Sequence, residues 1–330
     1  MKTHFGKAVR GCLVTLALAT LGWGAQAQAA EKASLRLSWI LQANFAPFFY
    51  GLDKGFYKAE GIDLTIHEGR GSSLSAKLVA QKKNTFGITD VGVAIKSIEK
   101  GLPIKVVWCH FQQTPIAVLS LAKNPIRRPK DLIGKRVASR ASSSMTILFG
   151  PMLRRNGVDP SKVMLTSSNP PYQPLLLAGK VDAMMGYWVD GVPKLEAFGV
   201  KVNAMKFYDW GMNILSNGIT THQDTIKAKP GLVRGFVKAS ARSWKEARTD
   251  TGGAIDSLLK RMAKGKRATQ LKNLKNAFQI LYTKNSRGKP LGWMSPKDWQ
   301  DTVDTLYNTK LIKVKSPIGR YYTNEFVPGS

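Results

Sequence analysis

Strand-like and helix-like segments alternate through the first two thirds of this chain, and this alternation constrains its fold more than any other feature. Helical periodicity appears at 73–82 and 91–99, and each of these segments lies between short apolar runs. The runs typical of buried strands are 35–39, 62–66, 86–89 and 104–108. Because a parallel sheet covered by helices is built from strand–helix–strand units, the sequence predicts an α/β fold with mostly parallel sheets.

The alternation is interrupted once and then resumes, which predicts two lobes. The segment AKNPIRRP at 122–129 contains two prolines and two arginines, and a second series of strand-like and helix-like runs follows it. The pattern then becomes helical toward the C-terminus. We therefore expect a first lobe of residues 30–120 plus 218–330 and an inserted second lobe of residues 121–217. Two chain crossings would form a hinge beside an interlobe cleft.

Residues 1–29 have the three parts of a secretory signal. A basic start is followed by an apolar run at 11–23, which is short for a membrane span, and by the cleavage pattern Ala27-Gln28-Ala29. A cut two residues earlier, after Ala27, fits the same pattern. We therefore expect an exported, periplasmic protein cleaved near Ala29. Cys109 is then the one remaining cysteine, so an intramolecular disulfide is excluded.

The formal net charge of +29 raises nucleic acid and anionic membranes as partners. The basic residues are scattered, however, and no nucleic-acid-binding motif accompanies them. We therefore expect no nucleic-acid partner and interpret the charge as a solvated basic surface. The expected partner is a small molecule bound by a monomer.

Polar and aromatic side chains gather where the predicted strands end, which is where open α/β sheets bind ligands. Aromatic rings stack on flat heteroaromatic molecules, and amides and carboxylates satisfy ring nitrogens and amino groups. The predicted ligand-binding residues are Trp39, Gln42, Asn44, Phe45, Ser72, Asp90, Gln113, Ser143, Tyr172, Tyr187, Trp188 and Asp190.

Two turns rich in glycine or serine, 69–73 and 141–144, leave a second ligand class open. Each opens a predicted helix, and the free amide hydrogens at a helix start attract anions such as a sulfonate or nitrate. Simple N-capping, which needs only one serine per helix, is the interpretation we prefer for these turns. Neither turn matches a phosphate-binding loop.

Residues able to support catalysis are sparse. The three histidines after the signal, His67, His110 and His222, form no metal-ligand spacing with one another or with Cys109. No GxSxG motif is present, and no carboxylate pair stands out as an acid/base couple. We therefore expect no catalytic residue, no metal and no cofactor.

Several segments resemble one known family. They are SWILQANFAPFFYGLDKGFYKAEGI at 38–62, DLIGKRVAS at 131–139, LLLAGKVDAMMGYWVD at 175–190 and LVRGFVKASARSWKEA at 232–247. They are similar to periplasmic ABC-transporter substrate-binding proteins of the group that includes thiamine-pyrimidine-synthase-like proteins and sulfonate, nitrate and taurine binders. The resemblance implies a two-lobed fold like that of type II periplasmic binding proteins. It also implies delivery of the ligand to an ABC permease in the inner membrane.

The resemblance also bears on the ligand. In pyrimidine-binding members Trp39 and the segment 186–190 would line the pocket, although Asp190 stands one position before the usual glutamate, where this chain has Gly191. The related synthases use a lysine that holds pyridoxal phosphate and a histidine, and at those positions this chain has Thr89 and Val93. We therefore expect a receptor for a thiamine-pyrimidine precursor or a similar planar molecule. A receptor for a sulfonate or nitrate and a pyrimidine synthase are the alternatives.

Overall fold

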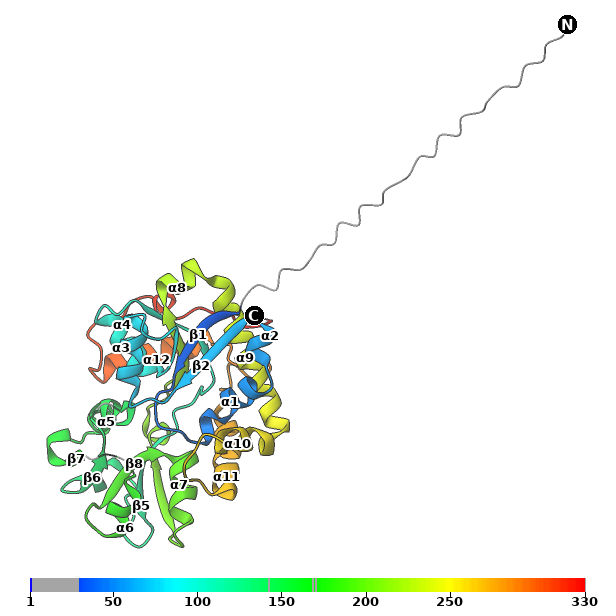
Figure 1. Ribbon diagram of the computed structural model, residues 1–330. Coiled ribbons are helices and arrows are strands. Elements are labelled where there is room, and N and C mark those ends of the chain that lie inside the picture. Colours follow the sequence, from blue (N-terminus) through cyan, green and yellow to red (C-terminus); the bar gives the residue numbers. More distant parts are fainter. Residues whose placement is uncertain (2–29, 142, 168, 170, 330) are drawn as a thin grey trace.

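The computed structural model describes Met1 and residues 30–329 apart from 142, 168 and 170. The predicted signal segment lies almost entirely outside the described residues. The described chain forms two five-stranded sheets with helices packed on their faces, and each sheet is the centre of one lobe (Figure 1). Within the described part of the chain, no helix combines the length and apolar character needed to cross a membrane.

The first sheet has the strand order β2-β1-β3-β10-β4. Its strands are β1 (Glu31–Arg36), β2 (Ile62–His67), β3 (Phe86–Asp90), β4 (Ile104–Cys109) and β10 (Asn217–His222). Strand β1 is parallel to β2 and β3, whereas β10 is antiparallel to β3 and β4. The sheet is therefore mixed rather than mostly parallel, because the chain returns from the second lobe through β10 in the opposite direction.

The second sheet has the order β7-β6-β8-β5-β9. Its strands are β5 (Ile116–Leu121), β6 (Arg136–Ser139), β7 (Met164–Ser167), β8 (Ala183–Tyr187) and β9 (Val202–Lys206). Strand β5 pairs antiparallel with β8 and β9, although the sequence-based boundary assigned it to the first lobe. The first crossing thus precedes β5, at 110–115, and the proline-rich segment after it connects elements of the second lobe. The second crossing lies at 207–216.

Helices cover the two sheets. In the first lobe they are α1 (Ala46–Asp53), α2 (Phe56–Ala59), α3 (Ser72–Ala80) and α4 (Val91–Glu99), and in the second α5 (Ser144–Arg155), α6 (Gln173–Leu177) and α7 (Trp188–Glu196). The periodicity at 48–57 predicts a single helix, but Gly55 separates α1 from α2 with a φ of 72°. That left-handed conformation suits glycine, because it has no Cβ.

The C-terminal tail adds five helices to the described part of the chain. They are α8 (Gln223–Ala228), α9 (Pro230–Thr249), α10 (Thr251–Leu259), α11 (Arg267–Ala277) and α12 (Pro296–Asn308). Helix α9 packs its broad apolar face on the first sheet, where the ring of Phe236 stacks on Phe86 with their centroids 3.9 Å apart. Through this packing, the C-terminal tail forms part of the first lobe.

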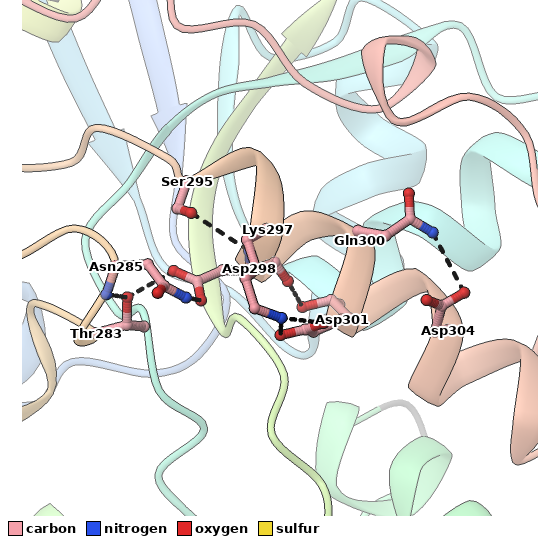
Figure 2. Close-up of polar contacts among 9 residues, drawn as sticks. Thr283, Asn285, Ser295, Lys297, Asp298, Gln300, Asp301 and Asp304 are labelled. Carbon is pink, nitrogen blue, oxygen red and sulfur yellow. Dashed lines mark hydrogen bonds and ion pairs between the residues drawn. The ribbon is translucent and has the colours of Figure 1, made fainter.

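Helix α12 begins with a network of polar contacts, shown in Figure 2. Ser295 caps the helix by accepting a hydrogen bond from the backbone N–H of Asp298. The carboxylate of Asp298 then accepts bonds from Thr283 Oγ1 at 2.5 Å and Asn285 Nδ2 at 2.6 Å. A carboxylate in the first turn also suits the positive end of the helix dipole. These contacts fix the start of the helix whose Trp299 is fully buried.

One apolar cluster spans both lobes. It joins Ile95 of α4 to Leu148 and Phe149 of α5, and it includes Trp299 and Val303 of α12. A second cluster lies mainly in the first lobe but includes Val189 of α7, and a third lies within the second lobe. The lobes are therefore connected by shared core packing between α4 and α5 and at Val189 of α7, as well as by the two chain crossings.

Candidate functional site

A cavity of about 790 Å³ lies between the two lobes. Its walls are side chains from three parts of the chain. The first lobe contributes residues within 38–42 and 71–72, the second lobe contributes residues within 143–145, 171–173 and 184–198, and the tail contributes residues within 264–270. Ligand pockets of proteins have volumes of roughly 300–1,000 Å³, so this cavity is large enough for a molecule of several rings.

The structure brings seven of the twelve predicted ligand-binding residues together around this cavity. They are Trp39, Gln42, Ser72, Ser143, Tyr172, Tyr187 and Asp190. They come from both lobes because strands of the two sheets end on opposite sides of the same cavity. The other five residues do not line it.

Trp39 and Ser72 form part of the wall supplied by the first lobe. Trp39 follows β1 and is half-buried, and the guanidinium carbon of Arg140 in the second lobe lies 5.9 Å from its ring centroid. Ser72 is the first residue of α3, and its hydroxyl accepts a hydrogen bond from the backbone N–H of Asp90 at 3.1 Å. The helix start therefore faces the cavity and is tied to the end of β3.

Two tyrosines form part of the wall supplied by the second lobe. Tyr187 ends β8, and its hydroxyl donates to Asn217 Oδ1 in the first lobe at 3.2 Å. Burial raises the pKa of both Tyr172 and Tyr187, to about 12 for Tyr172, so both stay neutral at physiological pH. The Tyr172 side chain is buried, and its hydroxyl has no hydrogen-bond partner among the described residues.

The carboxylate of Asp190 is occupied on both oxygens. Oδ2 pairs with Lys194 Nζ at 2.8 Å, and Oδ1 accepts a hydrogen bond from Asn273 Nδ2 at 2.9 Å. Lys194 also lines the cavity. The two charges compensate each other, so this part of the wall is close to neutral.

Sequence reasoning missed the wall formed by the tail. Lys264, Lys266, Thr269 and Gln270 line the cavity, whereas the tail helices were expected only to pack on the first lobe. One signal was present in the sequence: α11 has few apolar residues, so its buried face must include polar side chains, and these are Gln270 and Asn273. Local periodicity could not show which element that face would meet.

Five predicted residues lie elsewhere, and packing explains each case. Phe45 is fully buried in the first lobe, and the neighbouring Asn44 is 4% exposed. Gln113 donates to the carbonyl oxygen of Tyr282 at 3.4 Å. Trp188 begins α7 and lies beneath Lys206, whose Nζ is 4.4 Å from the ring centroid. The position after Tyr187 thus turns its ring away from the cavity.

Asp90, the fifth of these residues, lies just behind the cavity wall. It is fully buried and caps α4 by accepting a hydrogen bond from the Gly92 N–H at 3.0 Å. The Ser216 hydroxyl donates to its other oxygen at 3.0 Å. Burial raises the pKa of Asp90 to about 6. Its side chain is therefore part of the wall's support and not of its surface.

Two further groups singled out in the sequence are buried away from the cavity. Cys109 is fully buried, and burial raises the pKa of its thiol. His110 is packed against Trp108 and Trp244, and burial lowers its pKa to about 3. Among the described residues, no three His, Cys, Asp or Glu side chains are grouped so that they could hold a metal ion.

Two known proteins are similar to this chain in sequence over most of its length. The riboflavin-binding protein RibY of Chloroflexus aurantiacus is 25% identical and is aligned over 91% of this chain and 87% of its own length. The 4-amino-5-hydroxymethyl-2-methylpyrimidine phosphate synthase of Legionella pneumophila is 21% identical over 90% of this chain and 93% of its own.

A solved structure has the same fold as this chain. The alkanesulfonate-binding protein SsuA from Xanthomonas axonopodis pv. citri, bound to MOPS, superposes with a TM-score of 0.68 at 16% identity, covering 89% of this chain and 99% of its own. The expected periplasmic-binding-protein fold is thereby confirmed. The family model described as NMT1/THI5 like matches residues 42–253, more than half of the sequence, and the chain therefore belongs to the NMT1/THI5-like family.

Proposed function

We propose that this protein is the periplasmic solute-binding component of an ABC importer. In this proposal it captures a planar heteroaromatic molecule, a thiamine-pyrimidine precursor or a similar compound, in the cavity between its lobes. The observation that carries the proposal is the aromatic lining on both sides of the cavity, with Trp39 from the first lobe and Tyr172 and Tyr187 from the second. Rings placed in this way can stack on a flat ligand as the lobes close around it.

The polar groups of the wall suit an uncharged ring with hydrogen-bonding edges. Gln42 offers an amide, Ser72 a hydroxyl and Tyr172 a neutral phenol without a partner in the described chain. Asp190 and Lys194 neutralise each other, so the positive charge left in the wall is that of Lys264 and Lys266 on the tail. The similarity to a riboflavin-binding protein supports the same class of ligand.

A small anion is the second candidate ligand, because two helix starts face the cavity. Ser72 begins α3 and Ser143 caps α5, and both line the wall. The first turn of α3 has no side-chain cap, and the Leu74 N–H donates to the Gly71 carbonyl, so the N–H groups of Ser72 and Ser73 are the ones open to an oxyanion. A sulfonate would bind at these helix starts rather than between the aromatic rings.

A pyrimidine synthase activity is the enzyme alternative, since a synthase is among the relatives. The two positions expected to carry its lysine and histidine hold Thr89 and Val93, which are buried and absent from the cavity wall. A receptor is therefore favoured. If the protein were such an enzyme, incubation with pyridoxal phosphate followed by borohydride would fix an adduct on a lysine; we expect none.

Ligand titration of residues 30–330 tests the proposal. Thermal shift and tryptophan fluorescence would be measured with riboflavin, 4-amino-5-hydroxymethyl-2-methylpyrimidine and MOPS. We expect one heteroaromatic probe to bind and Trp39→Ala to weaken it about 10-fold or more, as for loss of a central aromatic contact. Trp293→Ala is the control, because Trp293 is half-buried but outside the cavity. Binding of MOPS alone would favour the anion, and unchanged binding by Trp39→Ala would refute the site.

A further inference from the structure

Helix α11 belongs to the C-terminal tail but contacts both lobes. On one side it packs against α10 and the short 3₁₀ turn Ala43–Phe45 of the first lobe, and on the other against α7 of the second lobe. Figure 1 shows α11 below α10 and beside α7. The helix also lies beyond residue 253, where the match to the family model ends. Its contribution to the cavity is therefore outside the region that this chain shares with the family model.

The contacts between α11 and α7 include polar ones beside the apolar packing of Val189, which belongs to the same cluster as Leu274 and Ala277. Besides the hydrogen bond from Asn273 to Asp190, Asn276 Nδ2 donates to the backbone carbonyl of Val189 at 3.3 Å, and Lys272 pairs with Glu196 at 2.7 Å. These polar contacts fix the position of α11 relative to α7, beside the buried Val189.

The side chain of Gln270, on α11, lies at the cavity wall and is 4% exposed. Its Oε1 atom has no hydrogen-bond partner among the described residues. A buried amide oxygen without a donor is unfavourable, and a donor on a ligand in the cavity would satisfy it. The Tyr172 hydroxyl of the second lobe is in the same condition, so two walls of the cavity present unsatisfied polar groups.

We infer that Gln270 is a specificity-determining residue of the cavity, and that the Asn273–Asp190 hydrogen bond positions it by holding α11 against α7. The inference rests on the proposed function. A glutamine side chain presents a carbonyl and an NH₂ group side by side. Their complement is a ring edge that carries an adjacent donor and acceptor, as aminopyrimidines and cyclic imides do. A sulfonate has acceptors only and would leave Oε1 unsatisfied.

This assignment gives Asp190 and Gln270 different roles. Both oxygens of Asp190 accept bonds from within the protein, so Asp190 is a positioning residue that acts through α11. Gln270 is the group that contacts the ligand. Loss of Asn273 should therefore speed the release of every ligand, whereas loss of the Gln270 amide should change the preference among ligands.

The test is isothermal titration and stopped-flow fluorescence with riboflavin, 4-amino-5-hydroxymethyl-2-methylpyrimidine and MOPS. Gln270→Met keeps the length of the side chain and removes the amide, and Gln270→Glu is a second variant that keeps only the acceptor. Gln300→Met on α12 is the matched control, because Gln300 is exposed and bonded to Asp304. Near-ultraviolet circular dichroism verifies that each variant is folded.

We expect Gln270→Met to weaken the preferred heteroaromatic probe about 10-fold or more while Gln300→Met binds as the wild type does. We expect Asn273→Ala to raise the dissociation rates of all bound probes without changing their ranking. If the wild type binds a heteroaromatic probe and Gln270→Met binds it with the same dissociation constant, the inference is wrong and the proposed function stands. If the wild type binds neither heteroaromatic probe, the proposed function fails and the inference falls with it.

Discussion

Replacement of Asp90 by asparagine probes the electrostatic cost of a carboxylate buried behind the cavity wall. Asp90 is fully buried, and its oxygens accept bonds from the Gly92 N–H and the Ser216 hydroxyl. Its charge acts on Tyr187 and Cys109, both of which are neutral at physiological pH, and no cation contributes to its own pKa shift. Burial is therefore not compensated by a cation, and it raises the pKa from 3.8 to about 6.

The sign and size of the effect follow from this shift. A group whose pKa is higher in the folded state than in the unfolded state stabilises the fold fully below the unfolded pKa, and this contribution is lost as the pH rises through the folded pKa. At about 1.4 kcal/mol per pKa unit, Asp90 should remove about 2 kcal/mol from the free energy of unfolding between pH 4.5 and pH 7.5. Asparagine has nearly the same shape, can still cap α4 and does not ionise.

The assay is urea unfolding, followed by tryptophan fluorescence at pH 4.5 and pH 7.5. We compare the free energy of unfolding of Asp90→Asn with that of the wild type at each pH. We expect this difference to shift in favour of Asp90→Asn by about 2 kcal/mol between pH 4.5 and pH 7.5. Asp250→Asn is the matched control, because Asp250 caps α10 with its side chain but is exposed. Parallel pH dependences for the wild type and Asp90→Asn would show that the raised pKa is incorrect.

The packing leads to three other predictions, two for substitutions and one for a labelling reaction. Gly292→Ala should lower the free energy of unfolding by about 3 kcal/mol or more, because Gly292 has a φ of 85° and a Cβ there would overlap the Trp108 ring; an unchanged urea midpoint would contradict this. Cys109 should resist a thiol reagent in the native protein and react fully in urea, because the thiol is buried and its pKa raised; rapid native labelling would contradict its burial. Tyr187→Phe should lower the free energy of unfolding by about 1 kcal/mol, since it removes the interlobe bond to Asn217, and urea unfolding beside Tyr208→Phe, an exposed position, measures the difference.

Local patterns in the sequence were sufficient to predict most elements near the cavity. The periodicity at 91–99 gives the bounds of α4 as observed, and the turn residues before 73 and 145 place the starts of α3 and α5 within one residue. Because strand ends and helix starts meet at one edge of an α/β sheet, seven predicted residues lie around one cavity.

The errors occurred where one residue or one distant contact decides the outcome. Tyr187 and Trp188 are neighbours, yet only Tyr187 lines the cavity, because successive side chains at a strand end point in different directions. The run 116–121 was apolar enough for a strand, but its pairing with β8 and β9 assigns it to the second sheet.

The sequence by itself determined the α/β class, the resemblance to a binding-protein family and the aromatic character of the strand ends. These properties arise from local periodicity and residue type, which can be read within a few residues of each other. The tertiary structure alone decided that β10 returns antiparallel, that Asp190 is engaged by Asn273, and that α11 completes the cavity. Asp190 and Asn273, for example, are more than 80 positions apart in the sequence. Contacts of this kind form only when whole helices and strands pack together.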